Sequence, residues 1–294
     1  MSDPPRPRPG RSESREVIEL RAIRESHPEL ADAIDMQIEV LELHRRVQGR
    51  VTLPFVDVNE EVIRSHVASG EPLLRFQDIR IEPTDLRLLV RQIADVMRRR
   101  GAIEDDDYQR IQLLARDMNL DVAERWYGRS AHRTAVAAVG SMPRHDEHHG
   151  PEEPRDEALD QVMALAMRPW MTRCADALQT ADLALWTHAH CPLCGAEPDF
   201  ALITPAAERH LICSRCALRW RFEPLTCPYC RNSDRSRITS FATPDGQYRV
   251  YACDVCHRYL KAYDGRHATR PVMPMVDTIA TLPLDAYAMQ RGYS

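Results

Sequence analysis

Hydrophobic positions in the first half of the chain recur at about 3.6-residue spacing, which predicts α-helices. After Pro28 this spacing is followed by Leu30, Ile34, Ile38, Leu41 and Val47. Capping side chains, prolines and carboxylates favour helix starts, and they occur at Asn59-Glu60-Glu61, Pro83-Thr84-Asp85 and Asp105-Asp106-Asp107. We therefore expect a helical domain over residues 16–139. The proline-rich segment before it, 1–15, is expected to be a disordered arm.

The periodicity stops in residues 140–155, where glycine, proline and three histidines predict an exposed linker. A connecting helix is predicted over 156–185. Its apolar face carries Leu159, Met163, Met167, Trp170, Cys174 and Leu178. A free cysteine on such a face behaves as a small apolar side chain, so Cys174 is not expected to bind a metal.

The pattern changes after Trp186, where aromatic residues become frequent and the helical period is lost. Residues 218–222 alternate as a half-buried strand does, and 243–247 carry a turn signal before a second short strand at 248–251. The tail, 271–294, returns to a helical pattern that is interrupted or entered at Pro283. The expected class is α+β.

The composition of the chain limits the classes of protein to which it can be expected to belong. The chain has 294 residues, of which 44% are hydrophobic and 28% charged, so it is expected to fold around more than one unit. No run of about 18 uncharged apolar residues predicts a membrane span, and the first residues lack the apolar core of a secretory signal. We expect a cytoplasmic protein. The net charge of −5 gives no general reason to bind nucleic acid or anionic membranes.

Eight of the nine cysteines form four Cys-x-x-Cys pairs. They are Cys191/Cys194, Cys213/Cys216, Cys227/Cys230 and Cys253/Cys256. In a reducing compartment such pairs indicate metal or redox chemistry. Two pairs brought together by a hairpin offer four thiolates in a tetrahedron, the geometry of a closed Zn or rubredoxin-type Fe site.

The spacing of the pairs predicts which of them share a site. Gaps of 18 and 22 residues separate the outer pairs from their neighbours and leave room for two short strands and a turn. The central gap of 10 residues fits a hairpin less well. We therefore predict one site in a module over 186–225 and a second in a module over 226–270. Interleaved pairing is the alternative. Modules this small gain folding energy from a bound metal.

Other interpretations of single pairs are weaker. Cys227-Pro-Tyr-Cys230 matches a redox dithiol, but no helical stripe follows it. The sequence Cys253-Asp-Val-Cys256-His257 matches a haem attachment sequence, which belongs to exported proteins. An Fe–S cluster is a further alternative. His188, His190 and His257 lie beside the cysteines and are expected to be neighbours rather than ligands.

Signatures of an enzyme are missing from the sequence. We find no nucleophile–base pair, no phosphate-binding loop and no carboxylate dyad, and a closed four-thiolate site has no open position for a substrate. Residues 186–270 carry twelve Arg and Lys against eight Asp and Glu. Two zinc ions with four thiolates each would cancel this excess. A zinc-ribbon nucleic-acid-binding protein is therefore an alternative without strong electrostatic support.

The order and context of the cysteine pairs resemble the FdhE family of formate dehydrogenase accessory proteins. In the cysteine region the resemblance rests on CPLCG followed by Pro198, on Leu211-Ile212-Cys213 with Trp220 downstream, and on Cys256 leading into Tyr259-Leu260-Lys261. In the tail it rests on Asp277, Ala280, Leu284, Asp285, Gly292 and Tyr293. The helical half contributes Gly70-x-Pro72-Leu73-Leu74. The resemblance is strong over about residues 186–293 and weaker in the helical half.

This resemblance implies an all-helical N-terminal domain followed by two rubredoxin-like metal modules. It also implies a cytoplasmic, non-enzymatic maturation factor that binds the catalytic subunit of respiratory formate dehydrogenase before export. The metal that the family implies is iron, although zinc fits four thiolates equally well. A rubredoxin-like electron carrier is the alternative from another class. The sequence does not predict the oligomeric state.

Overall fold

The computed structural model describes residues 13–54, 59–138, 156–177, 183–266 and 268–294. Of the predicted arm, 1–15, residues up to 12 lie outside the described residues, whereas Ser14 caps a helix that begins at Arg15, so the arm was predicted too long. The predicted linker 140–155, with its histidines, also lies outside the described residues. None of the helices within the described ranges has the length and hydrophobicity needed to cross a membrane.

The first half of the chain is helical, as its periodicity predicts. The helices are α1 (Arg15–Ser26), α2 (Ala31–Gln48), α3 (Glu60–Ser69), α4 (Pro83–Arg99), α5 (Asp105–Asp117), α6 (Leu120–Ala138) and α7 (Glu157–Ala177). The predicted starts of three of them are confirmed: Asn59 caps α3 by accepting from the amide of Val62 at 2.9 Å, Pro83 opens α4, and Asp105 opens α5. Local signals therefore fix the starts of these three helices.

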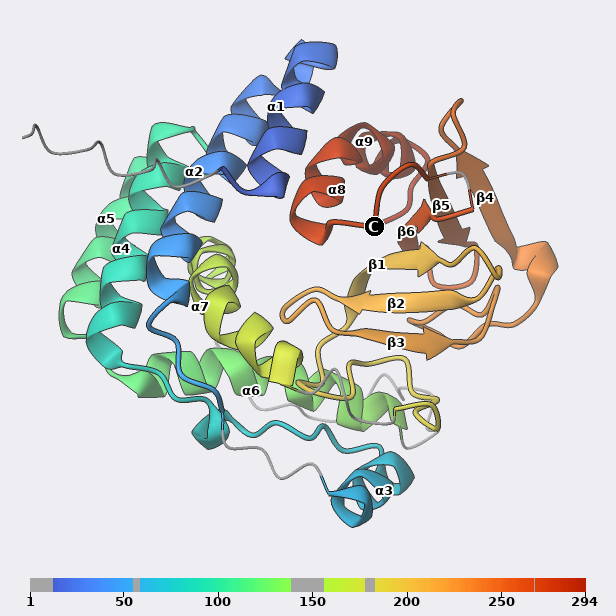
Figure 1. The fold of residues 1–294 in the computed structure, drawn as a ribbon, viewed down its shortest axis with the longest axis horizontal. Coiled ribbons are helices and arrows are strands. Elements are labelled where there is room, and N and C mark those ends of the chain that lie inside the picture. Colours follow the sequence, from blue (N-terminus) through green and yellow to red (C-terminus); the bar gives the residue numbers. More distant parts are fainter. Residues whose placement is uncertain (1–12, 55–58, 139–155, 178–182, 267) are drawn as a thin grey trace, which may run out of the picture.

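Helix α7 lies inside the helical half, where it packs against α2, α4, α5 and α6 (Figure 1). Of its predicted apolar face, Met163, Met167, Trp170 and Cys174 are buried, and Cys174 is 2% exposed, as expected for a core position. Leu159 is half-buried, and Leu178 lies outside the described residues. Burial raises the pKa of the Cys174 thiol to about 12. This thiol is therefore neutral at physiological pH.

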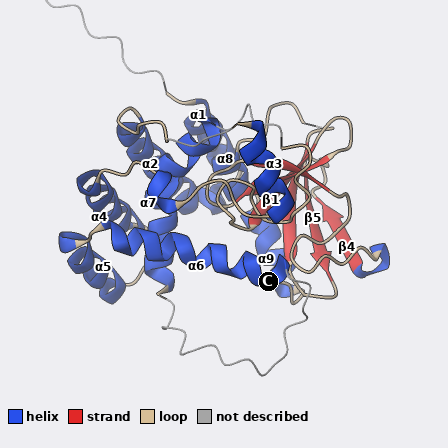
Figure 2. Cartoon of the chain, turned by 90° about the horizontal axis from the view of Figure 1, so that it is seen from below, coloured by secondary structure: helices blue, strands red, loops and turns tan. Residues whose placement is uncertain are grey.

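The second half forms one sheet of six strands at the other end of the molecule (Figures 1 and 2). The strands are β1 (Pro198–Ile203), β2 (Arg209–Cys213), β3 (Arg219–Phe222), β4 (Ile238–Ala242), β5 (Tyr248–Cys253) and β6 (Tyr259–Asp264). Each cysteine-containing unit supplies three consecutive antiparallel strands. The parallel pairing of β1 with β6 joins the two units and gives the order β3-β2-β1-β6-β5-β4.

The predicted alternation and turns are present in this sheet. Strand β3 alternates exposed and buried residues, and the turn predicted at 243–247 connects β4 to β5. The equivalent turn of the first unit also begins with Thr-Pro, at Thr204, and both turns place a residue with positive φ at the fourth position, Ala207 and Gly246. The two units are therefore built on one plan.

The tail forms two short helices, α8 (Pro274–Ala280) and α9 (Leu282–Gln290), where the sequence predicted one helical segment interrupted or entered at Pro283. Pro283 stands in the first turn of α9, a position that favours proline. Helix α8 packs against α1 and α2, and α9 packs against β5. The tail thus connects the sheet to the first helices of the chain.

One hydrophobic core runs through most of the molecule. It joins α2, α4, α5, α6 and α7 to the first cysteine unit and to β6. Trp170 of α7, Trp186 and Trp220 all belong to it, and each is 2% exposed or less. The first cysteine site is therefore part of the main core of the protein.

Candidate metal centres

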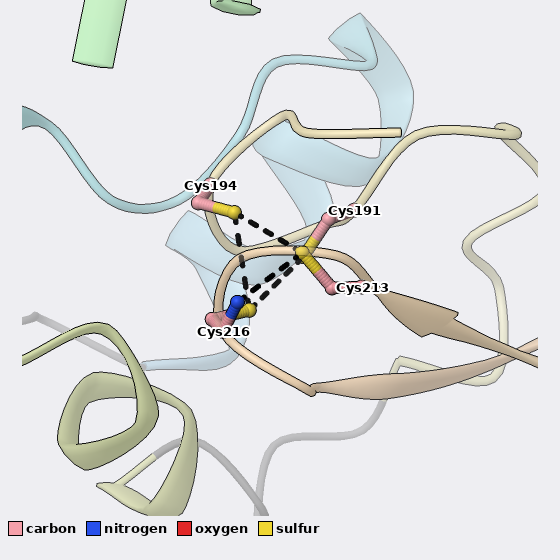
Figure 3. A group of neighbouring side chains, drawn as sticks. All are labelled: Cys191, Cys194, Cys213 and Cys216. Atoms are coloured by element: carbon pink, nitrogen blue, oxygen red, sulfur yellow. Dashed lines mark hydrogen bonds between the residues drawn. The ribbon is translucent and has the colours of Figure 1, made fainter. Parts of the chain in front are cut away.

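The first four cysteines meet in the main core, at a place that we call site 1. Two tight turns, 191–194 before β1 and 213–216 after β2, bring the four sulfur atoms together (Figure 3). All four residues are buried, with 1% exposure or less.

The other four cysteines form a second group, site 2. Its turns are 227–230 before β4 and 253–256 after β5, the same positions relative to the strands as in site 1. Cys227 and Cys253 are buried, whereas Cys230 and Cys256 are only half-buried. The cysteines are grouped as the sequential pairing predicts, so the interleaved alternative is wrong.

The distances between sulfur atoms match a four-sulfur metal site. In site 1 the Sγ atoms lie 3.6 Å apart for Cys191 and Cys216 and 3.5 Å apart for Cys194 and Cys213. In site 2 the corresponding distances are 3.7 Å and 3.6 Å. A disulfide has its sulfurs about 2.0 Å apart. Four sulfurs about 2.3 Å from a central ion lie about 3.8 Å from one another in a tetrahedron.

The four cysteine turns share one backbone conformation. The residue after each second cysteine has a positive φ, and these residues are Gly195, Ala217, Arg231 and His257, with φ values of 72°, 58°, 62° and 55°. The amide of each donates to the carbonyl of the first cysteine of its pair at 2.8–3.1 Å. This conformation directs both sulfurs of a turn to the same side. Only one of the four positions has glycine, so the other three bear the steric cost of the left-handed region.

The donor set of site 1 fits a divalent or trivalent metal ion. Burial raises the pKa of the Cys191 and Cys216 thiols, whereas hydrogen bonds from Cys191 and its neighbours lower the pKa of Cys194. Burial of four sulfur atoms this close together disfavours their joint ionisation. A metal ion would offset the repulsion between four buried negative charges.

The helical half covers site 1 directly. The amides of Leu73 and Leu74 donate to the carbonyls of Pro192 and Leu193, between the first two cysteines, at 2.9 Å and 2.8 Å. The hydroxyl of Tyr127 in α6 donates to the carbonyl of Leu74 at 2.6 Å. The metal turn and the helices are thus connected through main-chain groups.

His188 and His190, which precede site 1, contact the helical-half segment that contains Gly70, Leu73 and Leu74. Nε2 of His190 lies 2.9 Å from the carbonyl oxygen of Gly70, and a Cβ on Gly70 would lie 2.8 Å from the ring of His188. His257 stacks instead on Tyr293 of the tail. Among the described residues, the ligand-type atoms close enough to share an ion belong to the eight cysteines, in two sets of four. The histidines are therefore neighbours of the sites, as expected.

Comparison with known proteins finds similarity to FdhE proteins. No family model matches the chain. It is 20% identical over 279 residues to the FdhE homolog of Aquifex aeolicus (strain VF5), an alignment that covers 93% of this chain and 89% of that protein. It is 28% identical over 148 residues to the FdhE homolog of Stutzerimonas stutzeri (strain A1501), which covers 46% and 45% of the two chains.

The crystal structure of the FdhE protein from Pseudomonas aeruginosa has the same fold. Its TM-score with this structure is 0.60 at 19% identity, over 95% of this chain and 91% of that one. The chain is therefore similar to FdhE proteins in sequence and has their fold. The FdhE fold thus explains the combination that the sequence predicts, a helical N-terminal half and a sheet with two four-cysteine clusters.

Some residues that shape the two cysteine sites were not predicted as such. Arg215, Trp126 and Tyr127 are the clearest examples, because nothing in the sequence shows that α6 lies against the second cysteine turn of site 1. The stretch from Gly70 to Leu74 did carry a signal, since it contributes to the family resemblance, but its pairing with residues 192–193 is visible only in the structure.

Proposed function

We propose that this chain is a non-enzymatic accessory protein of formate dehydrogenase maturation. In this proposal it acts in the cytoplasm and binds the catalytic subunit of a respiratory formate dehydrogenase before that subunit is exported. Similarity to FdhE proteins supports this client. The two four-sulfur clusters support a fold that depends on bound metal. The observation that carries the proposal is the sulfur geometry of site 1, inside the core that joins the two halves.

The eight cysteines would hold two mononuclear ions, Cys191, Cys194, Cys213 and Cys216 one of them and Cys227, Cys230, Cys253 and Cys256 the other. The family favours iron. Bound zinc would supply folding energy alone, and bound iron would add one-electron chemistry. The chain itself fixes the sulfurs through its four equivalent turns and supplies a buried cation, Arg215, beside site 1.

The two units would present one continuous docking surface because they are firmly joined. Arg258 of the second unit forms an ion pair with Glu197 of the first at 2.8 Å, and its guanidinium lies 3.6 Å from the ring centre of Tyr229. The hydroxyl of Tyr229 donates to the carbonyl of Pro198 at 3.1 Å. Loss of either ion would therefore disturb the structure of both units of the sheet.

A pull-down with the formate dehydrogenase catalytic subunit, under anaerobic conditions, tests this function. The wild-type chain and a Cys174→Ser control should both retain the subunit, whereas Cys191→Ser should lose metal and retention together. Retention no greater than that of an unrelated bait would contradict the proposed client.

One alternative, a rubredoxin-like electron carrier, is favoured by the half-buried residues Cys230 and Cys256 of site 2, because an electron donor can approach this side of the site. Such a carrier would show reversible one-electron reduction, and it would lose its function with redox-inactive zinc. An accessory protein that only docks would bind its client equally well with either metal.

A further inference from the structure

We propose that the two centres have different roles: site 2 exchanges its ion with the surroundings through an edge formed by Cys230 and Cys256, and site 1 retains its ion. This inference rests on the proposed function only in that both clusters bind metal. It does not depend on the identity of the client.

The internal duplication allows a comparison of equivalent cysteines. Cys194 of site 1 corresponds to Cys230 of site 2, and Cys216 corresponds to Cys256, since each is the second cysteine of its turn. The two residues of site 1 are 0% and 1% exposed, whereas their counterparts are half-buried. The same ligand set is therefore closed in one unit and open on one side in the other.

Contacts from the helical half account for the closure of site 1. Leu73 and Leu74 pair with the first turn, Tyr127 donates to Leu74, and Arg215 of the second turn is held against Trp126. An incoming ligand can reach these sulfurs only after this cover separates from the turns. Such a local opening breaks several buried hydrogen bonds and is expected to be rare.

The equivalent positions of site 2 face solvent. Val255, which corresponds to Arg215, is 51% exposed, and Arg231 and His257 are exposed as well. The tail lies near this edge: Tyr293 donates to the carboxylate of Asp254 at 2.7 Å and stacks on His257. These contacts hold the turn but leave Cys256 half-exposed.

The inner pair of site 2, Cys227 and Cys253, is buried. Cys227 and Cys253 are 5% and 2% exposed. The buried guanidinium of Arg209 lies on this side, donates to the carbonyl of Thr226 at 2.8 Å, and leaves its Nε without a hydrogen-bond partner among the described residues. Its positive charge stabilises a nearby thiolate. The inner pair would therefore keep its sulfurs in place while the outer pair exchanges.

Exchange at this edge is a ligand substitution without a change in oxidation state. A donor atom of the incoming ligand would form a bond to the ion as the bond from Cys256 or Cys230 breaks. The released thiolate would take up the proton that an incoming thiol loses, or a proton from the buffer. Any soft chelator or thiol-bearing acceptor has the chemistry to do this.

The test is metal release from the full chain loaded with two zinc ions. An excess of 4-(2-pyridylazo)resorcinol is added, release is followed by absorbance, and samples taken early are alkylated with iodoacetamide and mapped by mass spectrometry. We expect one zinc per chain to leave about tenfold faster than the other or more, corresponding to at least about 1.4 kcal/mol of local opening. The early label should be on Cys230 and Cys256, with little on Cys194 and Cys216.

Tyr127→Phe provides a control for the cause of the difference. Loss of its hydrogen bond to Leu74 should speed release from site 1 about fivefold and leave site 2 unchanged. Release of both ions in a single phase, or early labelling of Cys194 and Cys216, would overturn the assignment. A chain that binds fewer than two zinc ions would contradict the proposed metal sites themselves, a failure visible before any release is measured.

Discussion

Arg215, in the second cysteine turn of site 1, stacks on Trp126 of helix α6. Its guanidinium carbon lies 3.9 Å from the centre of the indole ring, and its two terminal nitrogens donate to the carbonyls of Trp126 and Tyr127 at 3.0 Å and 3.1 Å. A planar guanidinium can stack and donate in this way at the same time. The helical half is therefore attached to site 1 through a residue placed between two of its cysteines.

Arg215→Ala should lower the free energy of unfolding by about 3 kcal/mol. The substitution removes a cation–π contact and leaves two buried carbonyls without their charged donor. Arg215→Lys should recover only part of this loss, because an ammonium cannot stack and bridge both carbonyls. Urea denaturation of the metal-loaded variants measures both effects. A loss below about 0.5 kcal/mol for the alanine variant would show that the contact is not important for stability.

Gly70→Ala should destabilise the protein by about 1–3 kcal/mol. Gly70 ends α3 with a φ of 72°, and an added Cβ would lie 2.8 Å from the ring of His188. Gly49→Ala is the matched control, since Gly49 ends α2 with a φ of −67° and has open space around its Cβ position. Thermal melting should show a lower Tm for the first variant and little change for the second. Equal shifts would contradict the role of Gly70.

Ala217→Gly should leave stability unchanged or raise it by up to about 1 kcal/mol. Ala217 has a φ of 58°, where glycine avoids a steric cost that alanine bears, although glycine has a higher entropy in the unfolded chain. Ala201→Gly in β1 is the control, because Ala201 is fully buried and lies in a regular strand. This control should lose about 1 kcal/mol or more. Similar losses for both variants, measured by urea denaturation, would argue against strain in the cysteine turns.

Stability should fall below neutral pH because of His44. Burial lowers the pKa of His44 to about 4, although its Nε2 lies 2.9 Å from the carbonyl oxygen of Leu165. A histidine in the unfolded chain has a pKa near 6.5. As pH falls from 7 to 5, the unfolded chain gains a proton at this site that the folded chain does not, so stability decreases by about 2 kcal/mol.

His44→Gln isolates this contribution. Glutamine can donate to the same carbonyl but does not titrate, so the variant should lose about 2 kcal/mol less than the wild type between pH 7 and pH 5. Urea denaturation at the two pH values gives the comparison. Parallel losses in the two proteins would show that His44 is not responsible.

Cys174→Ser should lower stability by about 1–2 kcal/mol without releasing metal. The hydroxyl of serine is more polar than the thiol that it replaces at this 2% exposed position. Metal content by elemental analysis should stay equal to that of the wild type. Loss of an ion from this variant would mean that the assignment of ligands is wrong.

Local signals in the sequence predicted much of this structure. The cap at Asn59, the prolines at 83 and 283, and the alternation in 219–222 each determine the backbone near them, and the structure agrees with them. The grouping of the cysteines also followed from sequence, since the length of chain between two pairs limits which hairpins can form. Interactions between residues that are close in the sequence were sufficient to predict these features.

Features that depend on contacts between distant segments could not be predicted. The parallel pairing of β1 with β6 and the pairing of Leu73 and Leu74 with residues 192–193 join parts of the chain more than fifty residues apart. The sequences of β1 and β6 resemble other buried strands, and the family resemblance of the Gly70–Leu74 stretch does not indicate which segment it pairs with. The different exposure of the two sites follows from these contacts, so it too required the structure.

X-ray absorption at the metal edge tests the central claim most directly. On the full chain purified without oxygen, together with elemental analysis, we predict two ions per chain and a first shell of four sulfurs at about 2.3 Å. A shell that contains nitrogen or oxygen, or less than one ion per chain, would contradict the claim that the eight cysteines enclose two metal ions.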